Sequence, residues 1–126
     1  MIRVLIIEDQ TIFREELKKS LRGHFPSMAV EEAGDGEEAL QKVSRTPPHL
    51  IFMDIHLPGV SGLRLTQQIK VAYPEVRIAM LTDYDFPEYR QAALQFGADS
   101  FFVKSSFRWD EVEALLASIC PEASSA

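Results

Sequence analysis

Five side chains that can do chemistry stand directly after short apolar runs of the sequence. They are Glu8, Asp9, Asp54, Thr82 and Lys104. Carboxylates gathered at one point repel one another, at about 4 kcal/mol for a pair about 4 Å apart at a surface-like dielectric. A divalent cation offsets that repulsion, and Mg2+ favours sites that combine few carboxylates with waters and a phosphate. The residue types therefore predict a site for Mg2+ and a phosphoryl group together.

The same set of residues indicates how a phosphoryl group would be handled. An aspartate carboxylate can act as a nucleophile toward phosphorus, and the product is an aspartyl phosphate. In such a transfer the protein mainly supplies positioning and charge neutralisation. The Lys104 ammonium would neutralise phosphoryl oxygens, and the Thr82 hydroxyl would donate a hydrogen bond to one of them. Each residue type is then explained by one role.

Short apolar runs alternate with longer amphipathic stretches along the chain. The runs predict strands at residues 2–7, 28–33, 50–53, 76–81 and 101–103. The amphipathic stretches predict helices at 10–22, from 36 to before the prolines at 47–48, at 63–72, 85–96 and 109–119. Gly23 is expected to stop the first helix, and Asp85 with Glu88 to form a capping box on the fourth. Glu31 and Glu32 interrupt the second strand, which places it at a sheet edge.

This alternation predicts an α/β fold, in which a five-stranded parallel sheet is wrapped by five helices on both faces. Right-handed crossovers make such a sheet doubly wound. The functional crevice then lies off the carboxyl ends of the strands. The reactive residues follow four of those ends, so the fold would gather them at one edge.

Composition sets limits on the function. The chain has 126 residues, which fits a single domain at 1–120 with a linker-like tail at 121–126. A net charge of −6 argues against nucleic-acid binding by this segment. One cysteine, Cys120, excludes an internal disulfide and suits a reducing compartment. No stretch has the length of a membrane span or the pattern of a signal peptide, so a cytoplasmic location is expected.

Four segments together resemble the receiver domain of two-component response regulators. They are LIIED at 5–9, MDIHLPGVSG at 53–62, MLT at 80–82 and GADSFFVK at 97–104. The resemblance extends over about residues 2–118. The stretches QTIFR at 10–14 and KSS at 104–106 are most similar to the NarL/FixJ-like subfamily, which has a LuxR-type DNA-binding output.

The resemblance implies a flavodoxin-like strand order of 2-1-3-4-5 and a role for each matching residue. Asp54 would be the phosphoacceptor, Thr82 the switch hydroxyl, Lys104 the phosphate-binding lysine and Phe101 the switch aromatic. Mg2+ would be held by Asp9, by Glu8 through water, by Asp54 and by the backbone carbonyl of His56. The implied donor is a histidine kinase or a phosphotransfer protein, and phosphorylation could lead to a homodimer. Such a domain is not an enzyme, beyond slow self-dephosphorylation.

Two positions depart from the family pattern, and two variable positions carry bulky residues. Asp83 stands where a small residue is usual, at the lip of the phosphate site. Ser105 replaces a usual proline after Lys104. His56 and Tyr84 are bulky at positions that tune the approach of water to the aspartyl phosphate, which predicts slow hydrolysis.

Other functions have to be weighed against this reading. A phosphatase with an aspartate nucleophile would want an acid two residues after Asp54, where His56 stands. A flavin-binding protein would need a hydroxyl- and glycine-rich loop in place of Glu8 and Asp9. A receiver that is never phosphorylated and acts as an interaction module stays open because of Asp83. Four aromatic residues could form a partner face or simple core, namely Phe86, Tyr89, Phe107 and Trp109.

Overall fold

The computed structural model describes residues 1–119, in which strands and helices alternate. The strands are β1 (Arg3–Ile7), β2 (Ala29–Ala33), β3 (Leu50–Asp54), β4 (Arg77–Thr82) and β5 (Ser100–Val103). The helices are α1 (Thr11–His24), α2 (Gly36–Arg45), α3 (Gly62–Ala72), α4 (Pro87–Gln95) and α5 (Trp109–Ile119), with a 3-10 turn η1 (Lys104–Ser106). The predicted strands and helices are confirmed, with some bounds shifted by one or two residues. The predicted tail at 121–126 lies outside the described residues.

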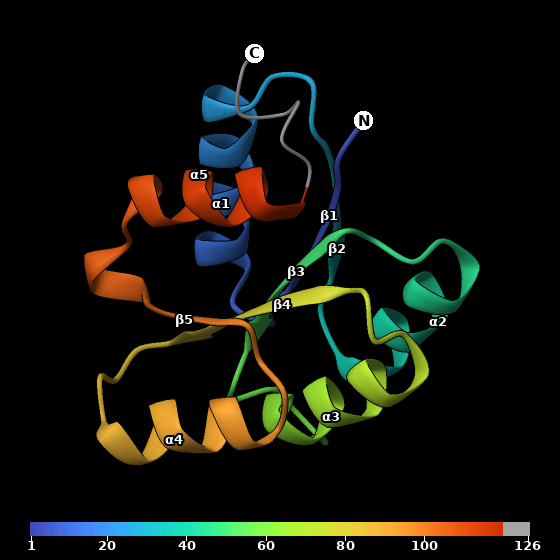
Figure 1. The fold of residues 1–126 in the computed structure, drawn as a ribbon, viewed down its shortest axis with the longest axis vertical. Helices are drawn as coiled ribbons and strands as arrows, with labels where there is room; N and C mark the ends of the chain where they lie inside the picture. The colour runs from blue at the N-terminus through green and yellow to red at the C-terminus, as the bar shows by residue number, and fades with distance from the viewer. Residues whose placement is uncertain (120–126) are drawn as a thin grey trace.

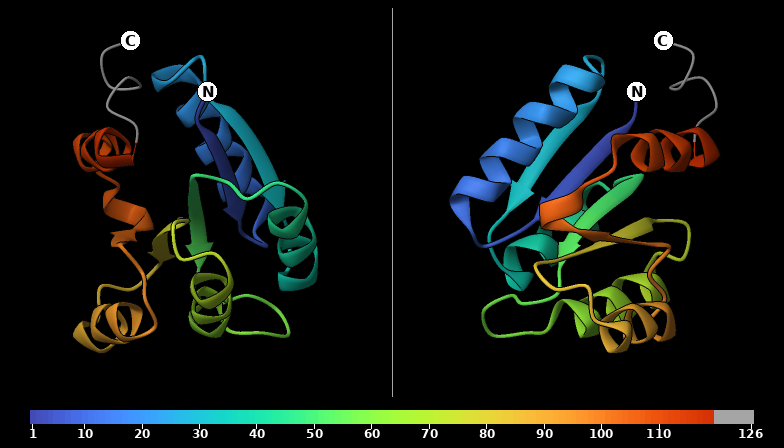
Figure 2. Two further views of the ribbon diagram at one scale, coloured as in Figure 1. Left: turned by 45° about the vertical axis from the view of Figure 1, so that its right-hand side comes forward. Right: turned by 90° about the vertical axis from the view of Figure 1, so that its left-hand side faces the viewer.

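The five strands form one parallel sheet in the order β2-β1-β3-β4-β5, as predicted. Helices α1 and α5 cover one face of the sheet, and α2, α3 and α4 cover the other (Figure 1). Figure 2 shows the sheet between these two helical layers. The arrangement is therefore doubly wound, and β2 with its two glutamates is at an edge, as expected.

Burial on both faces explains why the central strands read as unbroken apolar runs. In β3, Ile51 and Met53 belong to the core under α2, α3 and α4, while Leu50 and Phe52 belong to the core under α1 and α5. All five residues of β3 are buried. Because side chains of a strand point alternately to the two faces, β3 contributes to both cores and fixes the position of Asp54 at its end.

The expected stop of α1 at Gly23 is wrong. The helix continues through Gly23 to His24, and the Phe25 N–H caps it by donating to the Leu21 carbonyl at 2.8 Å. A glycine ends a helix when it takes a positive φ, and Gly23 does not. Gly97 does, with φ 102° just beyond α4. The Phe25 ring packs against the core under α1 and α5, which explains why the chain turns there instead.

The expected capping box of Asp85 and Glu88 is also wrong. Phe86 occupies the N-cap position of α4 and its side chain makes no capping hydrogen bond. Pro87 is the first helical residue, where its fixed φ and missing N–H suit the helix start. The Asp85 carboxylate accepts instead from Arg90 Nε at 2.7 Å, so it binds a side chain of α4 and does not cap the helix.

No helix within residues 1–119 is long and apolar enough to span a lipid bilayer.

Candidate functional site

Three carboxylates meet at the carboxyl ends of β1 and β3. Oxygens of Glu8, Asp9 and Asp54 all lie within 4.8 Å of one another. The two strands are paired, with Ile7 beside Met53, so the residues that follow must be neighbours. Glu8 and Asp54 are buried, at 0% and 3% exposure, whereas Asp9 is exposed. The predicted acidic cluster is confirmed, and one of its three members is open to solvent.

Lys104 brings one positive charge to the cluster. It follows β5 and reaches across the end of β4, which places Nζ 2.5 Å from Glu8 Oε1 and 3.6 Å from Asp54 Oδ2. Its side chain is only 6% exposed. The contact with Glu8 is an ion pair outside well-aligned hydrogen-bond geometry, since neither atom has a hydrogen-bond partner within the described chain. Both groups therefore keep hydrogen-bonding capacity in a buried place.

The backbone around Glu8 is held on both sides. The Glu8 N–H donates to the Ala33 carbonyl at 3.0 Å, which extends the pairing of β1 with β2 by one residue. The Glu8 Oε2 accepts from the Gln10 N–H, also at 3.0 Å. Asp9 lies between these two fixed residues, so the loop presents its carboxylate beside that of Asp54.

Burial, and next the neighbouring Glu8, raise the pKa of Asp54 to about 7, against the lowering effects of Lys104 and the His56 N–H. That N–H donates to Asp54 Oδ1 at 3.1 Å. Burial works to lower the pKa of Lys104, but Glu8, Asp54 and Asp83 together raise it above the usual lysine value. Lys104 thus stays an ammonium at neutral pH, while full ionisation of the acidic cluster requires more positive charge than Lys104 provides.

The acidic cluster fits a magnesium ion. Mg2+ takes oxygen ligands, keeps several waters and is usually bound by one or two carboxylates plus phosphate. The cluster offers one carboxylate oxygen from each of its three residues, and Asp9 is the exposed one. Burial first, and then the charge of Glu8, raise the pKa of Asp54, and a cation bound beside Asp54 would favour its ionised form.

Thr82 is fully buried at the end of β4, and the adjacent register pairs it with Val103, next to Lys104. The Thr82 Oγ1 accepts from the Tyr84 N–H at 3.2 Å. Because a hydroxyl that accepts one hydrogen bond can still donate another, the Thr82 proton remains available to an oxygen at the site.

Phe101 lies outside the acidic cluster. It is half-buried against the core under α2, α3 and α4, and the Arg90 guanidinium lies 4.6 Å from its ring centre. Phe102 points to the opposite face and is 4% exposed, so one of the two is plain core, as expected.

The four aromatic residues that could form either a partner face or core do not all have the same environment. Phe107 and Trp109 pack against the core under α1 and α5. Phe86 is 47% exposed and lies near Tyr89, with ring centres 5.5 Å apart. The exposed His56 ring stands edge-on to Tyr89 at 5.6 Å, so an aromatic group flanks the acidic site.

Sequence reasoning missed one residue next to the site. Arg14 of α1 donates from a guanidinium nitrogen to the Glu8 carbonyl at 2.6 Å. No residue pattern signals this contact, because the partner of Arg14 is a backbone carbonyl. The pair Glu31-Glu32 in the facing strand offered it a partner, but these acids were interpreted only as edge residues.

Comparison with known proteins identifies the family. Residues 4–116 match the response regulator receiver domain. The chain belongs to this family. The receiver is 33% identical over 103 residues to the transcriptional regulatory protein DegU of Brevibacillus brevis, covering 82% of this chain and 44% of that protein. The receiver spans about half the length of the curated relatives it matches.

Solved structures agree with the family assignment. The signal receiver domain of the response regulator NarL from Mycobacterium tuberculosis superposes with a TM-score of 0.83 at 29% identity, covering 94% of this receiver and 95% of that chain. The response regulator TrrA of Thermotoga maritima, in complex with Mg2+ and BeF, gives 0.81 at 33% identity over 94% and 99% of the two chains. The relatives include NarL and LuxR-family regulators, as the sequence resemblance predicted.

Proposed function

We propose that this receiver accepts a phosphoryl group on Asp54 from the phosphohistidine of a histidine kinase or a phosphotransfer protein, in a reaction that depends on Mg2+. The observation that carries the proposal is the buried Asp54 carboxylate, which stands between two further acids and the Lys104 ammonium. A match to the receiver family and a relative in complex with Mg2+ and BeF support it.

In the transfer, an Asp54 oxygen forms the new bond to phosphorus while the phosphorus–nitrogen bond of the donor breaks. The electron pair leaves with the imidazole, which takes up a proton. The Lys104 ammonium lies 3.6 Å from Asp54 and would balance charge on the phosphoryl oxygens, and the Thr82 hydroxyl would donate to one of them. Mg2+ held by Asp9, by Asp54, by the His56 carbonyl and by Glu8 through water would neutralise the remaining charge.

The signal would leave the site through Thr82 and Phe101. When Thr82 moves toward the phosphoryl group, the Phe101 ring would occupy the vacated space, and the face formed by α4, β5 and α5 would change. That face would control a transcriptional output, with a homodimer as one means, since the curated relatives are named as transcriptional regulators. The receiver itself would act in the cytoplasm as a phosphoacceptor and not as an enzyme.

A second candidate function is an interaction module that is never phosphorylated. Asp83 favours it, because this exposed carboxylate is one of the charges that raise the pKa of Lys104 and therefore acts on the phosphate-binding lysine. A negative charge there opposes the approach of an anionic donor.

Intact mass after incubation with a small acyl phosphate tests the proposal. Wild type is expected to gain one phosphoryl group with Mg2+ and none with a chelator, and Asp54→Asn none in either case. Labelling of Asp54→Asn to the same extent as wild type would contradict the assignment of Asp54. If wild type stays unlabelled while Asp83→Ala is labelled, Asp83 blocks small donors; if both stay unlabelled even with a histidine kinase, the interaction module is favoured.

A further inference from the structure

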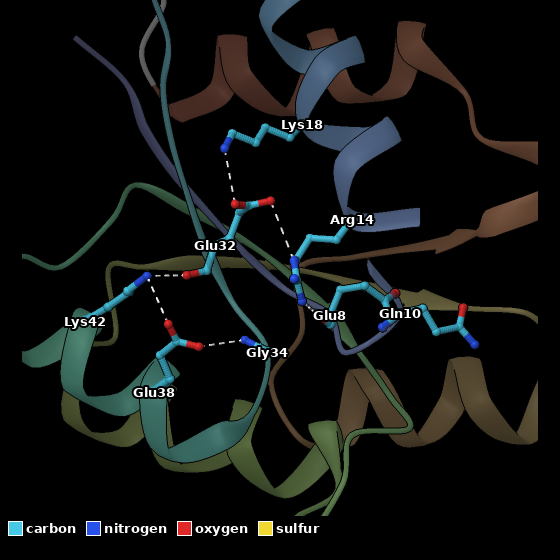
Figure 3. A network of polar contacts seen from close by, with 8 residues as sticks. All are labelled: Glu8, Gln10, Arg14, Lys18, Glu32, Gly34, Glu38 and Lys42. Carbon is cyan, nitrogen blue, oxygen red and sulfur yellow. Dashed lines mark hydrogen bonds and ion pairs between the residues drawn. The ribbon is translucent and has the colours of Figure 1, made fainter. Parts of the chain in front are cut away.

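A chain of polar contacts connects the acidic site to the edge of the sheet (Figure 3). At its centre is Glu32 of β2, whose carboxylate lies 3.1 Å from Lys18 Nζ and 3.6 Å from Arg14 Nε. The backbone carbonyl of Glu32 accepts from Lys42 of α2, which also pairs with Glu38 at 3.3 Å. Ion pairs and a hydrogen bond thus connect the edge strand to both flanking helices, in addition to the backbone hydrogen bonds that pair it with β1.

Arg14 is the member of this network that reaches the site. Its guanidinium bridges two groups, since one nitrogen contacts Glu32 and another donates to the Glu8 carbonyl at 2.6 Å. Figure 3 shows the side chain extending from α1 between these two partners. The side chain of Arg14 is only 19% exposed, and its Nε is buried without a hydrogen-bond partner within the described chain.

The carbonyl that Arg14 holds belongs to the peptide joining Glu8 to Asp9. A peptide unit is planar, so fixing its carbonyl oxygen also fixes the direction in which the following residue leaves. A short hydrogen bond from a charged donor is among the strongest available for this purpose. Asp9 is exposed and makes no hydrogen bond or ion pair of its own within residues 1–119, so its position depends on its backbone.

We propose that Arg14 is a positioning residue of the metal site, and that Glu32 holds Arg14 in place. It orients the Glu8–Asp9 peptide so that the Asp9 carboxylate faces Asp54, without touching the metal or the phosphoryl group. The inference rests on the proposed Mg2+-binding function and assigns a role to Glu32, one of the two adjacent acids of β2.

If Arg14 acted only through its charge, removing it would strengthen Mg2+ binding, whereas a positioning role predicts weaker binding. The direction of the change in Mg2+ affinity therefore tests the proposal. Removing a positive charge beside an acidic cluster makes the site more negative, and by Coulomb's law a cation should then bind more tightly. Loss of orientation should weaken binding instead. Partners that orient metal ligands typically contribute 10- to 100-fold in affinity.

The first measurement is the dissociation constant for Mg2+, by calorimetric titration of the folded receiver. Arg14→Gln is expected to weaken Mg2+ binding about tenfold. Arg14→Lys keeps the charge but lacks a fork of donors, so it is expected to fall between Arg14→Gln and wild type.

Lys18→Gln is the matched control. Lys18 lies on the same helix, pairs with the same Glu32 and carries the same charge, but it makes no contact with Glu8. It is expected to leave Mg2+ affinity at or slightly above that of wild type. Glu32→Gln is expected to weaken Mg2+ binding. Combining it with Arg14→Gln should weaken binding little further, because both changes disrupt the same contact between Glu32, Arg14 and the Glu8 carbonyl.

The outcomes distinguish Mg2+ binding by the receiver from the role of Arg14 in that binding. If wild type binds no Mg2+, the proposed function fails together with its metal site. If wild type binds Mg2+ and Arg14→Gln binds it equally well or more tightly, only the role of Arg14 is overturned. A circular dichroism spectrum of each variant verifies that a weakened site does not reflect an unfolded chain, and phosphorylation of Arg14→Gln should recover at saturating Mg2+.

Discussion

At the scale of single residues, the protonation of Asp54 dominates the chemistry of the site. Burial, together with the adjacent Glu8, raises the pKa of this carboxyl from 3.8 to about 7. In the proposed transfer Asp54 must be ionised to attack, so the buried environment of the site disfavours the reactive form of this carboxyl. Mg2+ bound beside Asp54 would favour ionisation and thus connect metal binding to reactivity.

This raised pKa predicts a dependence of stability on pH. The pKa of this carboxyl is higher in the folded state than in the unfolded chain. Its contribution to stability is therefore fully present at a pH below the pKa in the unfolded chain, and it is lost as the pH rises through about 7. Asp54→Asn cannot ionise, so in chelator its free energy of unfolding should exceed that of wild type by about 2–4 kcal/mol near pH 8 and converge with it near pH 4. Urea unfolding across this range measures the difference.

The control for this prediction is Asp83→Asn, which removes the same charge from an exposed position at the lip of the site. Its stability relative to wild type should change little over the pH range. An Asp54→Asn difference curve as flat as that of Asp83→Asn would contradict the buried-acid account.

The residue types of the site could be predicted because parallel strands bring their carboxyl ends to one edge. Glu8, Asp54 and Lys104 meet there as expected. The contact of Arg14 could not be predicted, because its partner is a backbone carbonyl and no residue pattern specifies it. Phe101 was expected as the switch aromatic, but its contact with Arg90 depends on how α4 packs on β5.

At the scale of elements, the start of α3 lies unusually close to the end of β3. The Gly62 N–H donates to the Ile55 carbonyl at 2.8 Å, and a Cβ on Gly62 would lie 1.9 Å from the Asp54 carbonyl oxygen. That oxygen belongs to the backbone and cannot rotate away. Glycine is therefore required here for close approach, and not for an unusual φ.

Gly62→Ala should accordingly destabilise the receiver by more than about 2 kcal/mol and weaken Mg2+ binding, because the strand end that carries Asp54 must shift. Gly23→Ala is the contrasting control, since nothing lies within 4 Å of its Cβ inside α1. It should stabilise the receiver by about 0.5–1 kcal/mol. Thermal unfolding of both variants gives the comparison, and equal stability of Gly62→Ala and wild type would refute the close-approach argument.

Helix α4 contacts Phe101, the proposed switch aromatic, through Arg90. The guanidinium lies over the Phe101 ring and also pairs with Asp85 in the loop after β4, so it joins that loop to β5. If activation moves the ring inward, this contact stabilises only the resting arrangement. An exposed cation–π contact is worth about 0.5–1 kcal/mol.

Arg90→Ala should therefore raise the affinity for beryllofluoride with Mg2+, used as a phosphoryl mimic, by about two- to fivefold. Arg90→Lys keeps a cation near the ring and should lie closer to wild type. Calorimetric titration of the mimic at saturating Mg2+ measures the effect. Equal affinity of Arg90→Ala and wild type would show that the contact does not oppose the active state.

The end of α1 and the start of α4 differ from the boundaries that the sequence predicts. The sequence offers Gly23 and Asp85 as boundary signals, yet Phe25 and Pro87 determine where the helices end and begin. In both cases packing or ring geometry overrides a local capping preference. Asp35, by contrast, caps α2 by accepting from the Glu38 N–H at 2.8 Å, because no stronger constraint competes there.

At the scale of the whole molecule, the layering followed from the alternation of apolar runs with amphipathic stretches, whereas the full strand order followed from the resemblance to the receiver family. A run as apolar as β3 has to be buried on both faces, which places it in the centre of the sheet. The charged β2 has to lie at an edge. The output of the longer regulators could not be read in this way, because the receiver spans only about half of the relatives it matches.

Folding and metal binding should be coupled across the molecule. The cluster combines Glu8 and Asp9 with Asp54, residues that are far apart in the chain and meet only when β1 and β3 pair. Mg2+ should thus bind the folded state alone and stabilise it by about 1.4 kcal/mol at ten times the dissociation constant. For a domain of this size the midpoint of thermal unfolding should rise by about 3–6 °C.

Sodium chloride at equal ionic strength should give a smaller rise, because screening relieves buried repulsion poorly. Asp9→Asn should keep the fold and remove the exposed carboxylate of the cluster, so it should lose most of the response to Mg2+ while keeping the response to salt. Asp54→Asn should start from a higher midpoint in chelator and also gain less from Mg2+, since its buried charge is already gone. If Mg2+ and sodium chloride raise the midpoint of wild type equally, the cluster is a solvated acidic patch and not a metal site.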